Sequence, residues 1–110
     1  MDVTPILQKA AEVGRMIRRT TIYTGYVRLR DEVNGDPRAK SLMDEYTRMA
    51  GEIAMRERSG DFVEDFEKDE LRELVERIGE DELLVDYIHA RDMYIMLLEN
   101  VRNSLMEMTD

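Results

Sequence analysis

The sequence contains no cysteine and no tryptophan, and it has only two prolines and a single histidine. Without cysteine, the chain alone cannot form disulfides, use a thiol nucleophile, or bind zinc or an iron–sulfur cluster through thiolates. No apolar run approaches the roughly 20 residues that a membrane-spanning helix needs. The first five residues also lack the basic and then apolar pattern of a signal peptide, so we expect a cytoplasmic protein that is not bound to a membrane.

Catalytic motifs are also missing. The sequence has no glycine-rich phosphate-binding loop, no Ser/His/Asp arrangement and no metalloprotease motif. Among its 25 acidic residues, no pair can be singled out for acid–base chemistry. We therefore predict that the protein is not an enzyme, that it has no catalytic, cofactor-binding or metal-ligating residues, and that it uses no cofactor.

The composition that remains is typical of helices. Charged residues make up 37% of the chain and hydrophobic residues 43%, while glycine and proline are sparse. The apolar fraction is too high for a disordered chain. The length suits one domain, which we predict to be helical and to span residues 1–110.

The net charge of −9 is unevenly distributed. Residues 1–40 hold eight Lys and Arg against five Asp and Glu, whereas residues 41–110 hold eight against twenty. The basic first third can therefore pack on the acidic remainder, within one chain or across a dimer. Because an acidic protein repels phosphates, we do not expect direct nucleic-acid binding. The opposing hypothesis, an RNA- or phosphate-binding patch close to Tyr23 and Tyr26, rests on Arg15, Arg18, Arg19, Arg28, Arg30, Arg38 and Lys40.

Apolar residues recur every three or four positions along most of the chain, which predicts a series of helices. Thr4 is the expected N-cap of the first helix, and the pair Thr20-Thr21 interrupts it. The clearest boundary is Asn34-Gly35-Asp36-Pro37, where Gly35 suits a left-handed helix stop and Asp36 suits the next N-cap. The predicted helices span about residues 4–19, 22–33, 37–58, 67–78 and 81–108.

Residues 61–70 carry six Asp and Glu and one Lys, yet they also contain Phe62, Val63 and Phe66. This combination predicts a loop that is anchored to the core by its aromatic side chains.

The last predicted helix is the longest, and its apolar residues follow steps of three and four that form a heptad seam. A stripe of this length needs to be covered by the rest of the chain or by a second copy. We predict an all-α, elongated bundle of about five helices with short connections and a long C-terminal helix, completed by dimerisation. The predicted interface residues are Leu84, Tyr87, Arg91, Tyr94, Leu98, Val101, Leu105 and Met108.

Arg91 is the one charged residue in this seam. It is either a buried charge that sets the register of an interface, or a side chain with a buried stem and a solvated head.

His89 lies three residues from Asp86 and from Asp92 on the same predicted helix. The Asp86-x-x-His89 spacing is similar to the Glu-x-x-His spacing of helical di-iron sites, which also need further carboxylates and a second such pair. The alternative is a surface histidine whose acidic neighbours raise its pKa.

The pattern resembles the YlbF/YmcA family of small all-helical bacterial and archaeal proteins. Asn34-Gly35-Asp36-Pro37 followed by Ala39, Leu42, Met43 and Tyr46 resembles the family's Asp-Pro-x-Ala-x-x-Leu-x-x-x-Phe/Tyr stretch. Gly60, the Glu-rich short helix and the Leu84-Val85-x-Tyr87 start of the last helix follow in the family's order, and the resemblance extends from about Leu7 to Met106.

The resemblance implies a helical protein that dimerises through long helices and acts as a non-enzymatic accessory factor. The best-understood members join a multi-protein complex that influences endoribonuclease-dependent RNA maturation and, through it, competence, biofilm formation and sporulation. Some carry iron–sulfur clusters on cysteines, a property that a chain without cysteine cannot share. We therefore expect a homodimeric adaptor or regulator with protein partners. The alternatives are a helical chaperone or antagonist that binds one client protein, and a metalloprotein centred on Asp86 and His89.

Overall fold

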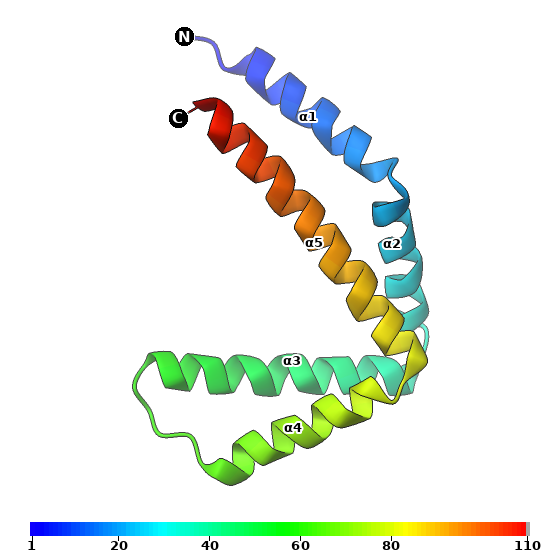
Figure 1. Cartoon of the computed structure of the whole chain (residues 1–110), viewed down its shortest axis with the longest axis vertical. Coiled ribbons are helices and arrows are strands. Elements are labelled where there is room, and N and C mark those ends of the chain that lie inside the picture. Colours follow the sequence, from blue (N-terminus) through cyan, green and yellow to red (C-terminus); the bar gives the residue numbers. More distant parts are fainter. Residues whose placement is uncertain (110) are drawn as a thin grey trace.

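The computed structural model describes residues 1–109, which form five helices and no strand (Figure 1). The helices are α1 (Thr4–Arg18), α2 (Thr21–Asn34), α3 (Pro37–Arg58), α4 (Asp65–Gly79) and α5 (Glu82–Thr109). The prediction of an all-α, elongated protein with five helices is confirmed. None of the helices in the described part combines the length and the apolar character that crossing a bilayer requires.

Local capping explains most helix boundaries. Thr20 is the N-cap of α2, and its side-chain oxygen accepts a hydrogen bond from the Tyr23 backbone N–H at 3.1 Å. The Asp36 carboxylate accepts from the backbone N–H groups of Arg38 and Ala39 at the start of α3, where Pro37 takes the first helical position. Asp81 accepts from the Leu84 backbone N–H at the start of α5. These three caps agree with the boundaries predicted from turn chemistry.

Two predictions about helix ends are wrong. Thr4 lies inside α1 and its hydroxyl donates to Asp2, while Val3 is the N-cap. Gly35 ends α2 with a φ of −86°, so it is not in the left-handed region. Its N–H instead donates to the Asp31 carbonyl at 3.0 Å, which continues the helical hydrogen-bond pattern for one more residue.

The α3–α4 connection also differs from the prediction. Helix α4 begins at Asp65, within the segment predicted to be a loop, and Gly60 supplies the positive φ of 79° that turns the chain after α3. The residue that anchors the connection is Val63, which is buried. Phe62 and Phe66 are exposed, so the aromatic side chains are not the anchor.

The helices form two arms that meet at one end (Figure 1). One arm pairs α3 with α4, and the other contains α5 packed against α2, which leads back into α1. The molecule measures 55 × 36 × 19 Å, so its thickness is about two helix diameters. A shape this thin leaves one side of most helices in contact with solvent.

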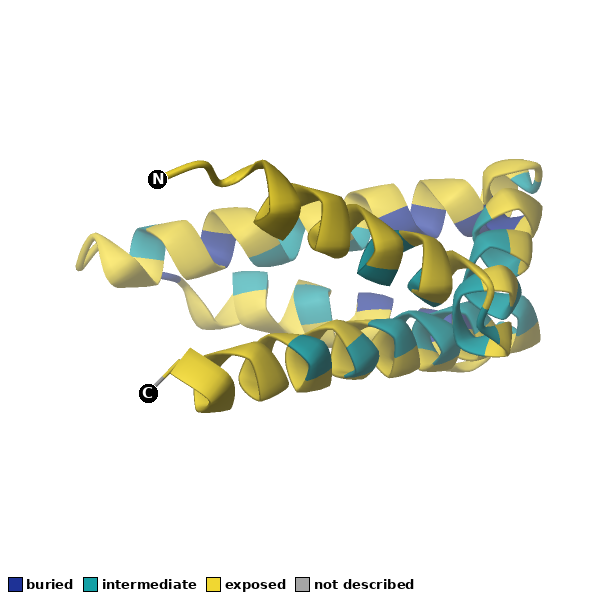
Figure 2. Cartoon of the chain, turned by 90° about the horizontal axis from the view of Figure 1, so that it is seen from above, coloured by how far each residue is buried: buried dark blue, intermediate teal, exposed yellow. Residues whose placement is uncertain are grey.

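The core lies where the two arms meet (Figure 2). Leu84 at the start of α5 is completely buried there, and Ala39 in the first turn of α3 is equally inaccessible. The Asp36-Pro37 boundary therefore directs the first turn of α3 straight into the core. The cluster comprises Val33, Ala39, Leu42, Met43, Leu74, Ile78 and Leu84.

Candidate protein interface

Four tyrosines hold α5 against α2. Tyr26 on α2 stacks on Tyr87 and on Tyr94 of α5, with ring centroids 6.0 and 5.0 Å apart, and Tyr23 meets Tyr94 edge to face at 5.5 Å. Aromatic pairs at such separations add to the stability that comes from burial alone. Burial is also the main reason why the pKa of Tyr87 is raised. These contacts hold the first half of α5 against α2. The second half of α5 extends beyond them, away from the core.

The second half of α5 lacks this cover. Leu98 is only partly shielded, and Leu105 and Met108 are exposed, although all three continue the seam that Tyr87 and Tyr94 begin. Among the described residues, α1 makes no close backbone contact with α5. The N-terminus of α1 and the C-terminus of α5 lie at the same end of the molecule (Figure 1), and the view from above shows the two helices separating toward that end (Figure 2).

The opposing helix α1 has an apolar stripe of its own. It contains no buried residue, and Ile6 is 65% exposed. Val13 and Ile17, which lie closer to α2, are half-buried. We refer to Ile6, Ala10 and Val13 on α1 together with Leu98, Leu105 and Met108 on α5 as the open face. Two apolar helical stripes left in solvent are typical of a surface that a partner covers.

The structure divides the predicted interface residues into two groups. Leu84 is buried in its own chain, and Tyr87 and Tyr94 contact α2. Val101 is half-buried, whereas Leu98, Leu105 and Met108 remain accessible to a partner. The prediction omitted α1, although the spacing of Ile6, Ala10, Val13 and Ile17 was a signal that could have included it.

Arg91 lies between these two groups. Its guanidinium is 5.8 Å from the centroid of the Tyr87 ring, and its nearest carboxylate, on Asp92, is 3.8 Å away. The side chain is partly buried, and the Nε atom is buried without a hydrogen-bond partner in the described part of the chain. This placement agrees with a buried stem and a partly solvated head.

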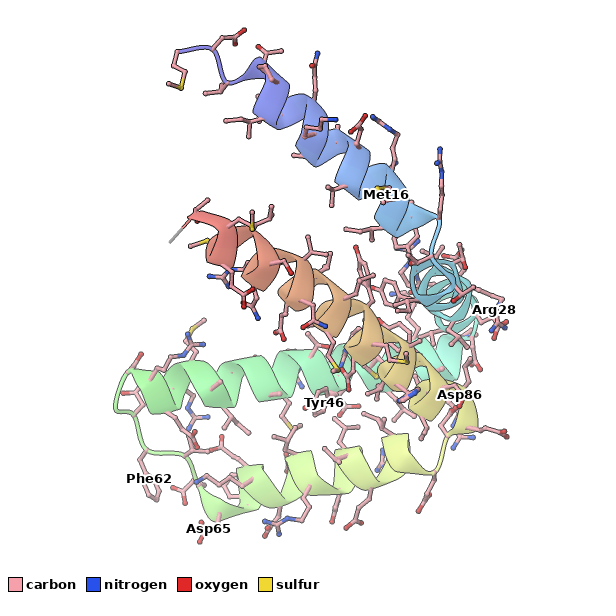
Figure 3. The ribbon with its side chains drawn as sticks, turned by 45° about the horizontal axis from the view of Figure 1, so that its top comes forward. Met16, Arg28, Tyr46, Phe62, Asp65 and Asp86 are labelled. Carbon is pink, nitrogen blue, oxygen red and sulfur yellow. The ribbon has the colours of Figure 1, made fainter. Side chains whose placement is uncertain are left out.

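A shallow groove of about 630 Å³ follows the contact between α2 and α5. Arg28 from α2 and Asp86 and His89 from α5 line it, and Figure 3 shows Arg28 and Asp86 on the same side of the molecule. Within residues 1–109, no group of three or more His, Asp or Glu side chains could hold a metal ion.

The comparisons with known proteins agree with this architecture. Residues 6–108 match the model of a family described as control of competence regulator ComK, YlbF/YmcA. The chain belongs to the YlbF/YmcA family. The resemblance inferred from the sequence is thereby confirmed.

A solved structure of Bacillus subtilis RicA in complex with RicF contains a similar chain, with a TM-score of 0.70 and 14% sequence identity over 94% of this chain and 92% of that chain. At this level of identity, the similarity shows a shared fold. No curated protein matches the chain.

In this YlbF/YmcA protein, the apolar residues of α3 that carry the family resemblance belong to the core. Ala39, Leu42 and Met43 are buried, and Tyr46 packs against them. The motif therefore specifies how α3 joins the other helices. The open face is formed by other parts of the chain.

Proposed function

We propose that the chain is a non-enzymatic regulatory adaptor and that its open face binds a second copy of the chain to form a homodimer. The observation that carries the proposal is the pair of uncovered apolar stripes on α1 and on the second half of α5. Helix α1 has 15 residues and is therefore about 22 Å long. Two copies would bring four such helical segments together, which is the number that encloses a bundle core.

The family supports the regulatory part of the proposal. Its description names control of a competence regulator, and the similar RicA chain was solved in a complex with RicF. We propose that this chain likewise acts through protein partners, as a cytoplasmic accessory factor in RNA processing or developmental regulation. Purification of the tagged protein from its native organism, with readout of both protein and RNA, tests this part. Recovery of the chain without any RNA-processing factor would contradict it.

Two variants of α5 test the dimer. Leu105 and Met96 are both 60% exposed, and they lie nine residues apart, which is about two and a half turns, so they occupy opposite sides of the helix. Burying an unpaired carboxylate in an interface costs several kcal/mol. Leu105→Asp should therefore weaken the dimer by about 100-fold or more, whereas Met96→Asp should leave it unchanged.

Sedimentation velocity across a range of concentrations measures this difference. A wild-type chain that remains monomeric at about 100 μM would contradict the dimer, because obligate interfaces are much tighter than that. Equal effects of the two substitutions would place the interface elsewhere on α5.

A second candidate function is a helical chaperone or antagonist that holds one client protein. The observation in its favour is the set of exposed methionines on α5, since methionine adapts to irregular partner surfaces: Met93, Met96, Met106 and Met108. Copurification distinguishes the two functions. One abundant client in a fixed ratio favours the chaperone, and an assembly of several regulatory proteins favours the adaptor.

A further inference from the structure

The α3–α4 connection is held rigidly although it lies at the far end of its arm. Arg56 on α3 donates to both carboxylate oxygens of Glu67 at 2.8 and 3.1 Å, and it also donates to the Phe62 carbonyl at 2.9 Å. Glu67 in turn accepts from the Glu64 backbone N–H at 2.9 Å and completes a capping box at the start of α4. With Val63 buried beneath, the connection has a defined conformation.

This rigid connection presents aromatic rings to solvent. Phe62 is 76% exposed and Phe66 is 59% exposed. Within the described residues, Asp61 and Asp65 form no ion pair, and Figure 3 shows Phe62 and Asp65 at the same end of the molecule. We call Asp61, Phe62, Asp65 and Phe66 the acidic tip. A connection that only joined two helices would gain nothing from phenyl rings held in water.

A surface with the complementary chemistry lies where α1 meets α2. Arg15, Arg18 and Arg19 are exposed and form no ion pair within residues 1–109. A shallow hollow of about 590 Å³ runs along α2 from Tyr23, three residues after the Thr20 cap, and Thr24 and Val27 also line it. We call the three arginines at the end of α1, together with the hollow along the helix that follows, the basic corner.

Charges at the far end of the hollow do not oppose an acidic ligand strongly. Asp31 and Glu32 also line it, but both carboxylates are paired with arginines. Asp31 Oδ1 lies 3.5 Å from Arg30 Nη2, and Glu32 Oε1 lies 3.5 Å from Arg28 Nη1. The arginines at the end of α1, which directly precede α2 in the chain, thus remain without an ion-pair partner among the described residues. Arginine beside an apolar depression suits an occupant that carries carboxylates next to aromatic rings.

We propose that the acidic tip of one copy docks on the basic corner of a second copy, with Phe62 and Phe66 entering the hollow along α2. The two surfaces lie at opposite sides of one molecule, so they cannot meet within a chain (Figure 1). The contact joins different patches on the two copies, which makes it head-to-tail and leaves a free tip and a free corner at the ends of each pair. Continued addition therefore produces open chains or rings.

The proposal is independent of the dimer proposed above. The basic residues of α1 lie away from the Ile6 side of the helix, because Arg15 falls half a turn and Arg18 a third of a turn around the helix from Ile6. Docking of the tip thus leaves the open face available. The net charge of −9 makes two copies repel at long range, but at physiological salt this repulsion is screened beyond about 8 Å, whereas groups in contact are screened much less.

Sedimentation equilibrium of the full chain in a Leu105→Asp background tests the proposal without contribution from the open face. We expect this parent protein to associate into species larger than a dimer as its concentration rises toward about 1 mM. The double substitution Phe62→Ser and Phe66→Ser should weaken this association by at least about tenfold. Val75→Ser, at an exposed apolar position on α4 away from the tip, is the matched control and should have no effect.

Exchange of charges provides the decisive measurement. A tip variant (Asp61→Arg, Asp65→Arg) and a corner variant (Arg18→Asp, Arg19→Asp) should each fail to associate with themselves. Mixed in equal amounts, they should associate with an affinity within about threefold of the parent, because each now carries the complement of the other. Circular dichroism confirms that both are folded.

Three outcomes would overturn the proposal: a parent that stays monomeric throughout, an unchanged affinity in the phenylalanine variant, or no gain on mixing the two charge variants. If Leu105→Asp leaves the wild-type dimer intact while the charge exchange works, the homodimer proposal fails and the tip contact stands.

Discussion

Replacing Leu84 and Leu105 separately by alanine distinguishes the core of the chain from its open face. Both residues belong to α5 and lose the same atoms on substitution. Leu84 is 0% exposed in the core, whereas Leu105 is 60% exposed on the open face. The same chemical change should therefore have two different consequences, one independent of protein concentration and one dependent on it.

The expected magnitudes follow from burial. Leu→Ala at a fully buried site costs about 3–5 kcal/mol, which includes the cavity left behind. The unfolding entropy of a chain of this size is about 0.23 kcal/mol per degree, so Leu84→Ala should lower Tm by about 13–22 °C. In an isolated chain, Leu105→Ala should cost less than about 1 kcal/mol, because much of its side chain already contacts water.

Thermal melts at about 2 and 200 μM separate the two effects, because binding of a second copy stabilises the folded chain by mass action. The decrease in Tm caused by Leu84→Ala should be the same at both protein concentrations. The decrease in Tm caused by Leu105→Ala should be small at the lower concentration and larger at the higher one. A loss from Leu105→Ala that equals that of Leu84→Ala at both concentrations would refute the reasoning, because it would mean that α1 closes over α5 within one chain.

Two further predictions concern a helix cap and an ion pair. Asp36→Ala removes the carboxylate that caps α3, so urea titrations should show the free energy of unfolding reduced by about 1 kcal/mol, whereas Asp36→Asn should retain most of this stabilisation. An equal loss of stability in both variants would contradict a capping role. The hydrogen bond from Arg56 lowers the pKa of Glu67, so the stabilisation by its carboxylate is complete above the unfolded pKa of about 4.3 and is lost as the pH falls through the folded value. The difference in Tm between the wild type and Glu67→Gln should therefore narrow between about pH 6 and pH 3, and a constant difference would contradict the pairing.

The helix boundaries at Thr20, Asp36 and Asp81 were predictable because each depends on a side chain that bonds to a backbone N–H two or three residues ahead. Such contacts are local and need no knowledge of the rest of the fold. Gly35 is a case that such local reasoning does not decide. A glycine can end a helix in the left-handed or in the right-handed helical region, and Gly35 ends α2 in the right-handed one.

The burial of the aromatic residues could not be predicted in this way. Phe62, Val63 and Phe66 are all apolar, and hydrophobicity alone favours the two larger side chains as the anchor. Val63 is buried because Gly60 and the Arg56–Glu67 ion pair direct this one residue inward. That direction depends on contacts between α3 and α4, which the sequence does not display.

The sequence by itself determined that the chain is helical, where most helices begin, and which side of α5 is apolar, because propensity, capping and periodicity act over a few residues. Only the tertiary structure decided what covers that side. The tyrosine contacts with α2 cover its first half, and the divergence of α1 leaves Leu105 and Met108 in solvent. The physical reason is that a heptad pattern shows which side of a helix must be buried but not which helix covers it. The covering helix depends on the direction in which each helix leaves its connection.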